Sequence, residues 1–238
     1  MKKKIVYSAL LFITVAFVLV AYNSFNGNPV SGMLSKKALE RYLADRYPDK
    51  ELQIEEGVYN FKFAEYVFDV MEVGDRTRSY QFTLTGFFKP EVNVDGIHDA
   101  NLDEQLMERL GGEASKELKA VLKQKVSRLV GVDVYLEVLK DKLADDTKWS
   151  KDIKLDGPMQ IELVLDAADS DQEDVYHAAK TVQHVLKDQG YDYGYVNINA
   201  NDFDGEDTKD MESGYVKYAV SFEKDADIKL SDVETLNQ

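Results

Sequence analysis

The chain has 238 residues and no cysteine, with 44% hydrophobic and 31% charged residues and a formal net charge of −15. This composition excludes a disulfide-stapled fold and a lipid anchor on cysteine, and it is too apolar for a disordered chain. Its acidity argues against nucleic acid, anionic lipid headgroups and anionic wall polymers as partners and would attract cations and basic peptides. A charge that only keeps an exposed domain soluble is favoured over a specific cationic partner.

The N-terminus predicts a membrane anchor, residues 1–26. Three lysines at positions 2–4 precede an apolar run from Ile5 to Tyr22 that is interrupted only by Ser8 and Thr14. As a helix this run spans about 27 Å, close to the thickness of a hydrocarbon core. The positive-inside rule then places the lysines in the cytoplasm and the C-terminal domains, with a net charge of −18 once those lysines are set aside, outside the membrane.

A cleaved secretory signal is the alternative interpretation of this segment. The apolar run is longer than the usual signal core, and no small-x-small cleavage site follows it at residues 20–24. Retention as a single-pass anchor is therefore favoured. Asn23–Ser31 then predicts a short linker between the bilayer and the first domain.

Residues 27–130 predict a first α+β domain. Good helix formers from Ser35 to Arg46 predict a helix ended by Pro48. Three segments rich in β-branched and aromatic residues predict a three-stranded antiparallel meander: Leu52–Val58, Tyr66–Val73 and Arg78–Phe88. In the third segment one face is expected to carry Tyr80, Phe82, Leu84 and Phe88.

Two helices are predicted to complete this domain. The first starts at a capping pair, Asn101 and Glu104, and is interrupted at Gly111-Gly112; the second covers residues 118–129 and ends at Gly131. The apolar residues of Val132–Val138 fit either a strand or a helix. We favour the strand and place the domain boundary at residues 130/131.

Residues 131–238 predict a second α+β domain of order β-α-β-β. Met159–Asp166 alternates like a strand, and a capping box at Ser170–Glu173 begins a helix that ends at Gly190. Tyr195–Asn201 and Tyr215–Glu223 alternate again and are expected to pair as a hairpin. The fold class is thus α+β: one membrane helix and two small domains, each a helix on an antiparallel sheet.

The acidic loop between these last strands offers weak candidates for calcium ligands: Asp202, Asp204 and Asp207. Placing Gly205 at the sixth position of an EF-hand loop puts Ala200 and Met211 at the first and twelfth positions, where acids are needed. A solvated hairpin loop is the favoured interpretation.

His177 and His184 are the weak candidates for other metals. They lie seven residues apart on the predicted helix, about 10 Å along its axis, so one ion cannot easily bind both. His98 stands alone in a predicted loop. Because the chain also lacks a nucleophile elbow and a phosphate-binding glycine pattern, no catalytic or cofactor-binding residue and no cofactor is predicted.

Tyrosines gather around the terminal hairpin. Tyr218 fits the core face, whereas Tyr193, Tyr195 and Tyr215 are expected to be free and form a candidate edge for binding a peptide or protein. Core or edge packing is the favoured interpretation of these side chains, and the binding edge is the alternative. Trp149 is expected to pin the connection between the two domains.

Several segments of the chain resemble the YfjL-like family, an uncharacterised group of membrane-anchored proteins from Gram-positive bacteria. The residues that carry the resemblance are Gly27–Ser31, Lys37–Leu43, Tyr47-Pro48, Tyr59–Lys62 and Trp149–Lys151. The resemblance implies a bacterial envelope setting and a two-part architecture, and it brings no activity or site residues.

Together these patterns predict a membrane-anchored, extracytoplasmic binding or sensing module. Its expected partners are the membrane, through Ile5–Tyr22, and an envelope protein or peptide. An envelope hydrolase, a metal-dependent enzyme, a calcium-binding surface protein and a structural spacer remain alternatives, and contact is favoured over catalysis.

Overall fold

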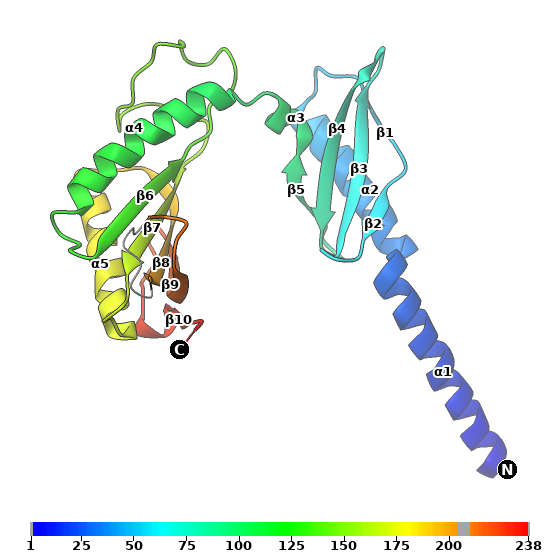
Figure 1. Ribbon diagram of the computed structural model, residues 1–238. Coiled ribbons are helices and arrows are strands. Elements are labelled where there is room, and N and C mark those ends of the chain that lie inside the picture. Colours follow the sequence, from blue (N-terminus) through cyan, green and yellow to red (C-terminus); the bar gives the residue numbers. More distant parts are fainter. Residues whose placement is uncertain (1, 204–209, 238) are drawn as a thin grey trace. The chain divides into compact units, whose positions relative to one another are not determined.

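A computed structural model describes residues 2–203 and 210–237 (Figure 1). The chain is α+β, with two sheets, each in a unit with its own core. The units are Met1–Asn101 and Leu102–Gln238. The division falls about thirty residues before the predicted boundary at 130/131, because helix α4 (Glu104–Leu122) packs in the core of the second unit.

Helix α1 (Lys2–Asn26) is long and apolar enough to cross a membrane by length and composition. Helix α2 (Pro29–Arg46) follows almost at once, so the predicted linker at 23–31 is wrong. The break consists of Gly27, with a positive φ of 73°, and Asn28, whose side chain caps α2 by accepting a hydrogen bond from the Val30 N–H. Pro29 suits the first helical position, where no N–H is required.

Tyr66 ties this break to the first sheet. Its hydroxyl donates to the Asn28 carbonyl at 2.7 Å and accepts from the Asn28 N–H at 2.9 Å, and it lies 2.9 Å from the Ser31 hydroxyl. A Cβ on Gly27 would lie 2.5 Å from the Tyr66 hydroxyl, so only glycine fits there. The end of α1 is therefore packed against the first sheet.

The first sheet is antiparallel and has five strands: β1 (Leu52–Ile54), β2 (Val58–Asn60), β3 (Glu65–Glu72), β4 (Asp75–Thr85) and β5 (Glu91–Asp95). The predicted three-stranded meander is thus too small, because its first strand is two short strands and β5 was not predicted. Helix α2 packs on the sheet (Figure 1). The core residues are Leu39, Leu43, Tyr66, Phe68, Val70, Phe82, Leu84 and Ile97.

Phe88 corrects the predicted core face of β4. The strand ends at Thr85, and Gly86, with a φ of 100°, turns the chain away. Phe88 lies in the following turn and is 87% exposed, whereas Phe82 and Leu84 are fully buried as predicted.

Asp95 joins three elements of the first unit. One carboxylate oxygen accepts from the Ile97 and His98 N–H groups and caps helix α3 (Gly96–Ala100), so His98 lies in a short helix and not in a loop. The other oxygen accepts from the hydroxyls of Tyr42 at 2.8 Å and Tyr47 at 2.6 Å. Burial, together with this hydrogen bond to Asp95, raises the pKa of Tyr42 to about 12.

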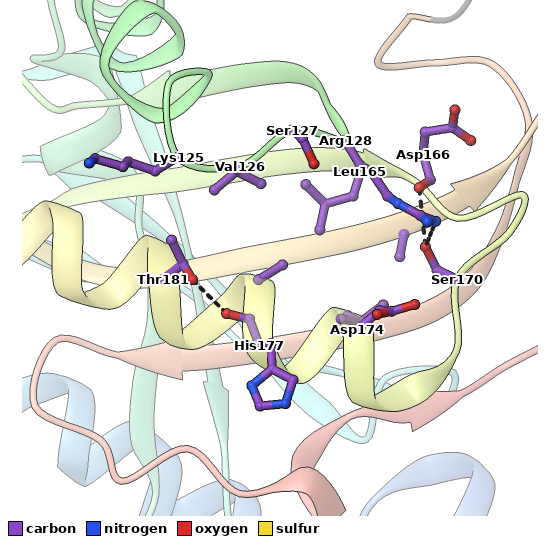
Figure 2. Close-up of a pocket in the computed structure, with 13 residues that line it drawn as sticks. Lys125, Val126, Ser127, Arg128, Leu165, Asp166, Ser170, Asp174, His177 and Thr181 are labelled. Atoms are coloured by element: carbon purple, nitrogen blue, oxygen red, sulfur yellow. Dashed lines mark hydrogen bonds between the residues drawn. The ribbon is translucent and has the colours of Figure 1, made fainter.

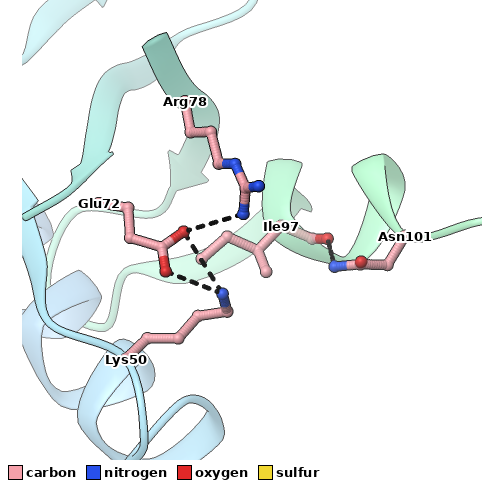
Figure 3. Close-up of polar contacts among 5 residues, drawn as sticks. All are labelled: Lys50, Glu72, Arg78, Ile97 and Asn101. Carbon is pink, nitrogen blue, oxygen red and sulfur yellow. Dashed lines mark hydrogen bonds and ion pairs between the residues drawn. The ribbon is translucent and has the colours of Figure 1, made fainter. Parts of the chain in front are cut away.

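Polar surface contacts lie at the end of the same sheet where β3 turns into β4 (Figure 3). Glu72 lies 3.4 Å from the Lys50 ammonium and 3.8 Å from the Arg78 guanidinium, and the Asn101 side chain donates to the Ile97 carbonyl at 2.7 Å. Because the charged groups are partly exposed, each ion pair contributes about 0–1 kcal/mol. They order the sheet end and do not form a site.

The second unit contains α4 (Glu104–Leu122), β6 (Leu129–Tyr135), β7 (Met159–Asp166), α5 (Gln172–Gln189), β8 (Tyr193–Asp202), β9 (Tyr215–Glu223), a 3-10 turn (Leu230–Asp232) and β10 (Glu234–Thr235). The sheet order is β10-β9-β8-β7-β6. Strands β7 and β8 are parallel, so the prediction of an antiparallel second sheet is wrong. Helix α5 makes the long crossover that parallel neighbours require.

Helix α4 explains the shifted domain boundary. Its buried side chains belong to the second core and are Leu106, Leu110, Ala114, Leu118 and Leu122. The glycine pair does not interrupt it, because Gly111 is the point at which α4 approaches β6. A Cβ on Gly111 would lie 2.6 Å from the Val134 carbonyl oxygen. The Ser115 hydroxyl strengthens the crossing by accepting from the Val134 N–H at 2.9 Å.

The predicted helix at 118–129 is right only for residues 118–122, the last part of α4, and it is too long because β6 begins at Leu129. The strand interpretation of Val132–Val138 fits β6, which lies three residues earlier. Asp171 caps α5 in a capping box with Asp174, one residue beyond the predicted pairing, and Gly190 ends the helix as predicted.

Trp149 lies in the long β6–β7 connection and packs against the second core, so it does not pin a connection between domains. Its backbone N–H donates to the Glu113 carboxylate at 2.8 Å, and Arg109 donates to the same group at 3.1 Å. The hydrogen bond from the Trp149 backbone holds the pKa of Glu113 below its ordinary value of 4.5. The hydrogen bond between Trp149 and Glu113 therefore holds the β6–β7 connection against α4.

Candidate functional site

One face of the second sheet packs on the core. The other face is exposed only in part, because Gly131 and Val164 on that face are buried and Met211 lies against Gly131. Directly opposed residues share a face, and the covered rows are Val132–Leu163–Ile198–Val220 and Val134–Ile161–Val196–Phe222, all buried in the core. Two rows lie on the opposite side: Asp133–Glu162–Asn197–Ser221 and Tyr135–Gln160–Tyr195–Glu223. We call these eight residues the open face.

The open face is polar with two aromatic side chains. Tyr135 is 43% and Tyr195 40% exposed, and they flank Gln160, which accepts a hydrogen bond from the Tyr195 hydroxyl at 2.7 Å. With neighbouring strands about 4.8 Å apart, the two tyrosines lie about 10 Å apart across β7. Such tyrosines offer contact area with a polar tip, as recognition surfaces often do.

Carboxylates supply all the formal charge of the open face. Asp133, Glu162 and Glu223 are exposed, and none of its eight residues is Lys or Arg. The Ser221 hydroxyl donates a hydrogen bond to the Asn197 side-chain oxygen at 2.8 Å, which orders these two side chains beside Glu162 in the first of the two rows. The face therefore carries negative charge and no positive charge, so it can attract cations.

The three candidate tyrosines do not form one surface. Tyr193 is only 2% exposed and its hydroxyl donates to the Lys224 carbonyl at 3.3 Å, so its predicted freedom is wrong. A register shift causes the difference: Tyr193 opposes Met159, whereas Tyr195 opposes Gln160. One extra residue, Gly194, thus sends side chains two positions apart to opposite faces.

The term "edge" is also wrong for Tyr195, because β8 lies inside the sheet between β7 and β9. Tyr215 is 46% exposed at the start of β9, opposite Asp202. It lies at the end of the sheet, opposite Asp202, which is five residues along β8 from the nearest open-face position, Asn197. Of the three predicted residues, only Tyr195 belongs to the open face.

The metal candidates do not come together. His177 pairs with Glu173 at 3.6 Å and His184 with Asp188 at 3.1 Å, on exposed parts of α5. Within residues 2–203 and 210–237 no three His, Asp or Glu side chains gather as metal ligands. Asp202 is the last residue of β8, and Asp204 and Asp207 lie outside the described residues.

A polar hollow of about 210 Å³ lies beside the start of α5 (Figure 2). Arg128 points across it to the Ser170 hydroxyl, and the Asp166 N–H donates to the Arg128 carbonyl at 2.9 Å. Asp174, on its rim, is occupied in the α5 capping box. The volume is below the usual range for small-molecule pockets, about 300–1,000 Å³. Through these hydrogen bonds, Arg128 holds the start of β6 against the turn between β7 and α5.

The comparisons with known proteins cover both units. Residues 2–96 match the model of the YfjL-like N-terminal domain, and residues 113–236 match that of the YfjL-like C-terminal domain. The chain belongs to the YfjL-like family. The interval between the two models contains the division after Asn101, which agrees with the structure and not with the predicted boundary.

A full-length relative of the family has no assigned function. The chain is 34% identical over 234 residues to "Uncharacterized protein YfjL" of Bacillus subtilis (strain 168), covering 98% of this chain and 99% of the relative. A crystal structure of a DUF5037 family protein from Ruminococcus gnavus ATCC 29149 aligns over 83% of this chain and 96% of its own. Its TM-score of 0.28 and 11% identity carry no argument about fold or function.

Sequence reasoning missed most of the open face. The alternation Asp133, Val134, Tyr135 was a usable signal, because it places polar residues opposite the core side of a strand. The cross-strand partners could not be assigned without the order β9-β8-β7-β6, in which a parallel pair joins two antiparallel ones.

Proposed function

We propose that this YfjL-like protein is a membrane-anchored binding module whose second unit recognises a polypeptide on the outer side of the cytoplasmic membrane. Helix α1 would be the anchor, with the lysines at 2–4 in the cytoplasm. The open face would be the contact surface. The observation that carries the proposal is an exposed part of the central sheet face that bears two half-exposed tyrosines among carboxylates.

The chemistry of the open face favours a basic partner segment. Three carboxylates and no cation on the face match a segment that carries Lys or Arg, and the acidity of the whole chain would speed the encounter. Tyr135 and Tyr195 would supply the apolar contact. Because β7 and β8 lie inside the sheet, recognition would use side chains on the face and not strand addition.

Photocrosslinking in intact cells tests this proposal. Replacing Tyr195 or Tyr135 with p-benzoylphenylalanine keeps an aromatic ring in place and should give a discrete protein adduct after irradiation. The control position is His184, which is exposed on α5. Failure of both tyrosine positions to form an adduct, or the same adducts from His184, would refute the open face as a binding surface.

A charge reversal separates local recognition from overall acidity. In the Tyr195 crosslinking variant, Glu162→Lys should lower the adduct yield roughly tenfold, equivalent to about 1.4 kcal/mol of lost affinity. Glu173→Lys makes the same change of charge on exposed α5 and should leave the yield within about twofold, about 0.4 kcal/mol. Equal losses from both variants would contradict recognition by the open face.

A further inference from the structure

The end of the first unit next to α1 carries exposed phenylalanines in two turns. Phe61 and Phe63 lie between β2 and β3 and are 51% and 70% exposed; Phe87 and Phe88 lie between β4 and β5 and are 45% and 87% exposed. We call these four residues the aromatic tips. Leaving four rings in water is unfavourable, so such a patch marks a contact surface.

Strand register places both turns at one end of the sheet. Glu65 opposes both Asn60 and Thr85, and Thr85 opposes Glu91, so the two turns leave the sheet side by side. Figure 1 shows both turns at the end of the first sheet that lies nearest α1. The turn at Val73-Gly74 lies at the opposite end.

The aromatic tips continue the surface of helix α1. The ring of Phe25, in the last turn of α1, lies 5.4 Å from that of Phe61. Phe87 and Ala64 line one hollow of about 500 Å³ together with Val20 and Ser24 of α1. Phe25 is three residues beyond Tyr22, about 4.5 Å along the helix axis, at the depth where membrane proteins place interfacial aromatics.

The two turns also lack the acidic residues that are frequent in the rest of the chain. Neither turn, residues 61–64 or 86–90, contains Asp or Glu, although the chain has 44 acidic residues, and none occurs between Ile5 and Leu39. The cations of the turns are Lys62 and Lys89; Lys89 lies 3.5 Å from Glu91, in a highly exposed and therefore weak pair. The two turns themselves thus carry only positive charge towards a phosphate-bearing surface, whereas Glu65 and Glu91 lie in the strands at their bases.

We propose that the aromatic tips insert into the interface of the same bilayer that α1 crosses, so that the first unit lies on the membrane and does not hang from a flexible tether. The inference rests on the proposed membrane anchor. Phe61, Phe63, Phe87 and Phe88 enter the boundary between headgroups and acyl chains, with Lys62 and Lys89 at phosphate level. The Tyr66 contacts to Asn28 keep α1 and the sheet in the arrangement that this insertion needs.

Tryptophan scanning of the full chain in vesicles tests this insertion. The native chain has a single tryptophan, Trp149, in the second unit, so the wild type gives the background signal. Phe63→Trp and Phe88→Trp place a reporter at the tips, and Val73→Trp, at a 53% exposed position of the opposite end, is the matched control. Phe12→Trp reports on α1 itself.

The proteins are reconstituted in vesicles of phosphatidylcholine and phosphatidylglycerol, with or without bromine on the acyl chains. Insertion by about 5–10 Å should bring shallow bromines within reach of the tips. In Phe63→Trp and Phe88→Trp, the fluorescence of the introduced tryptophan above the Trp149 background should then fall roughly twofold. Val73→Trp should stay at the wild-type level, and deep bromines should quench Phe12→Trp.

The other outcomes overturn either the insertion of the tips or the membrane anchor itself. Quenching of Phe12→Trp without quenching at either tip leaves the anchor standing and overturns the insertion of the tips. Equal quenching of Val73→Trp also overturns it, because contact would then not be confined to this end. If Phe12→Trp escapes quenching, the anchor fails, and the inference fails with it.

Discussion

Asp95→Ala should lower the free energy of unfolding of the first unit by about 2–4 kcal/mol, because two hydrogen bonds to a charged acceptor and a helix cap are lost together. The hydroxyls of Tyr42 and Tyr47 would lose the acceptor that joins α2 to β5, and α3 would lose its cap. Hydrogen exchange of the β3 and β4 amides measures the loss. Asp49→Ala, at an exposed position, is the control and should change stability by less than about 0.5 kcal/mol.

The same cluster predicts how stability changes at alkaline pH. Tyr42 has a pKa of about 12 in the folded protein and an ordinary value of 10.0. Its contribution is therefore fully present below pH 10 and is lost as the pH rises from 10 towards 12. Asp95→Ala should flatten this decline. An unchanged alkaline profile, or a loss of stability no larger than that of Asp49→Ala, would contradict the joining role of Asp95.

Gly111→Ala should destabilise the second unit by about 1–3 kcal/mol, because a methyl group would overlap the Val134 carbonyl and push α4 away from β6. Gly112→Ala makes the same change one residue later, where nothing lies within 4 Å of the new carbon. There the higher helix propensity of alanine should stabilise the unit by about 0.5–1 kcal/mol.

The two glycine variants should therefore differ in sign. Trp149 packs on the second core and is the only tryptophan, so its fluorescence during urea unfolding in detergent reports on this unit. Equal midpoints for Gly111→Ala and Gly112→Ala, or a stabilised Gly111→Ala, would show that α4 does not depend on close approach at this position.

These glycines also show what the sequence could and could not predict. A glycine pair inside a helical pattern fits either an interruption or a close approach, and only the position of β6 decides between them. By contrast, Met159–Asp166 and Tyr215–Glu223 were predicted with their observed bounds, because alternation along a strand is a local property.

The candidate site was harder to predict for the same physical reason. Exposure of Tyr195 follows from alternation, but burial of Tyr193 depends on a register shift against β7, a strand some thirty residues earlier. Helix α4 could not be assigned to its unit from its own apolar stripe, which does not say which sheet it covers. The sequence does not indicate that the four phenylalanines of the aromatic tips are exposed at one end of the sheet. Phe88 is placed in the core by strand alternation alone, because the pattern does not show that the strand ends at the Gly86 turn.

The central claim, an α1 anchor with both sheets outside the membrane, is tested most directly by cysteine labelling, since the chain has no cysteine of its own. Lys4→Cys and Ser231→Cys are both exposed positions and mark the two sides. In intact protoplasts, a membrane-impermeant maleimide should label Ser231→Cys and should reach Lys4→Cys only after permeabilisation. Labelling of Lys4→Cys but not Ser231→Cys in intact protoplasts, or recovery of both variants in the soluble fraction, would contradict the claim.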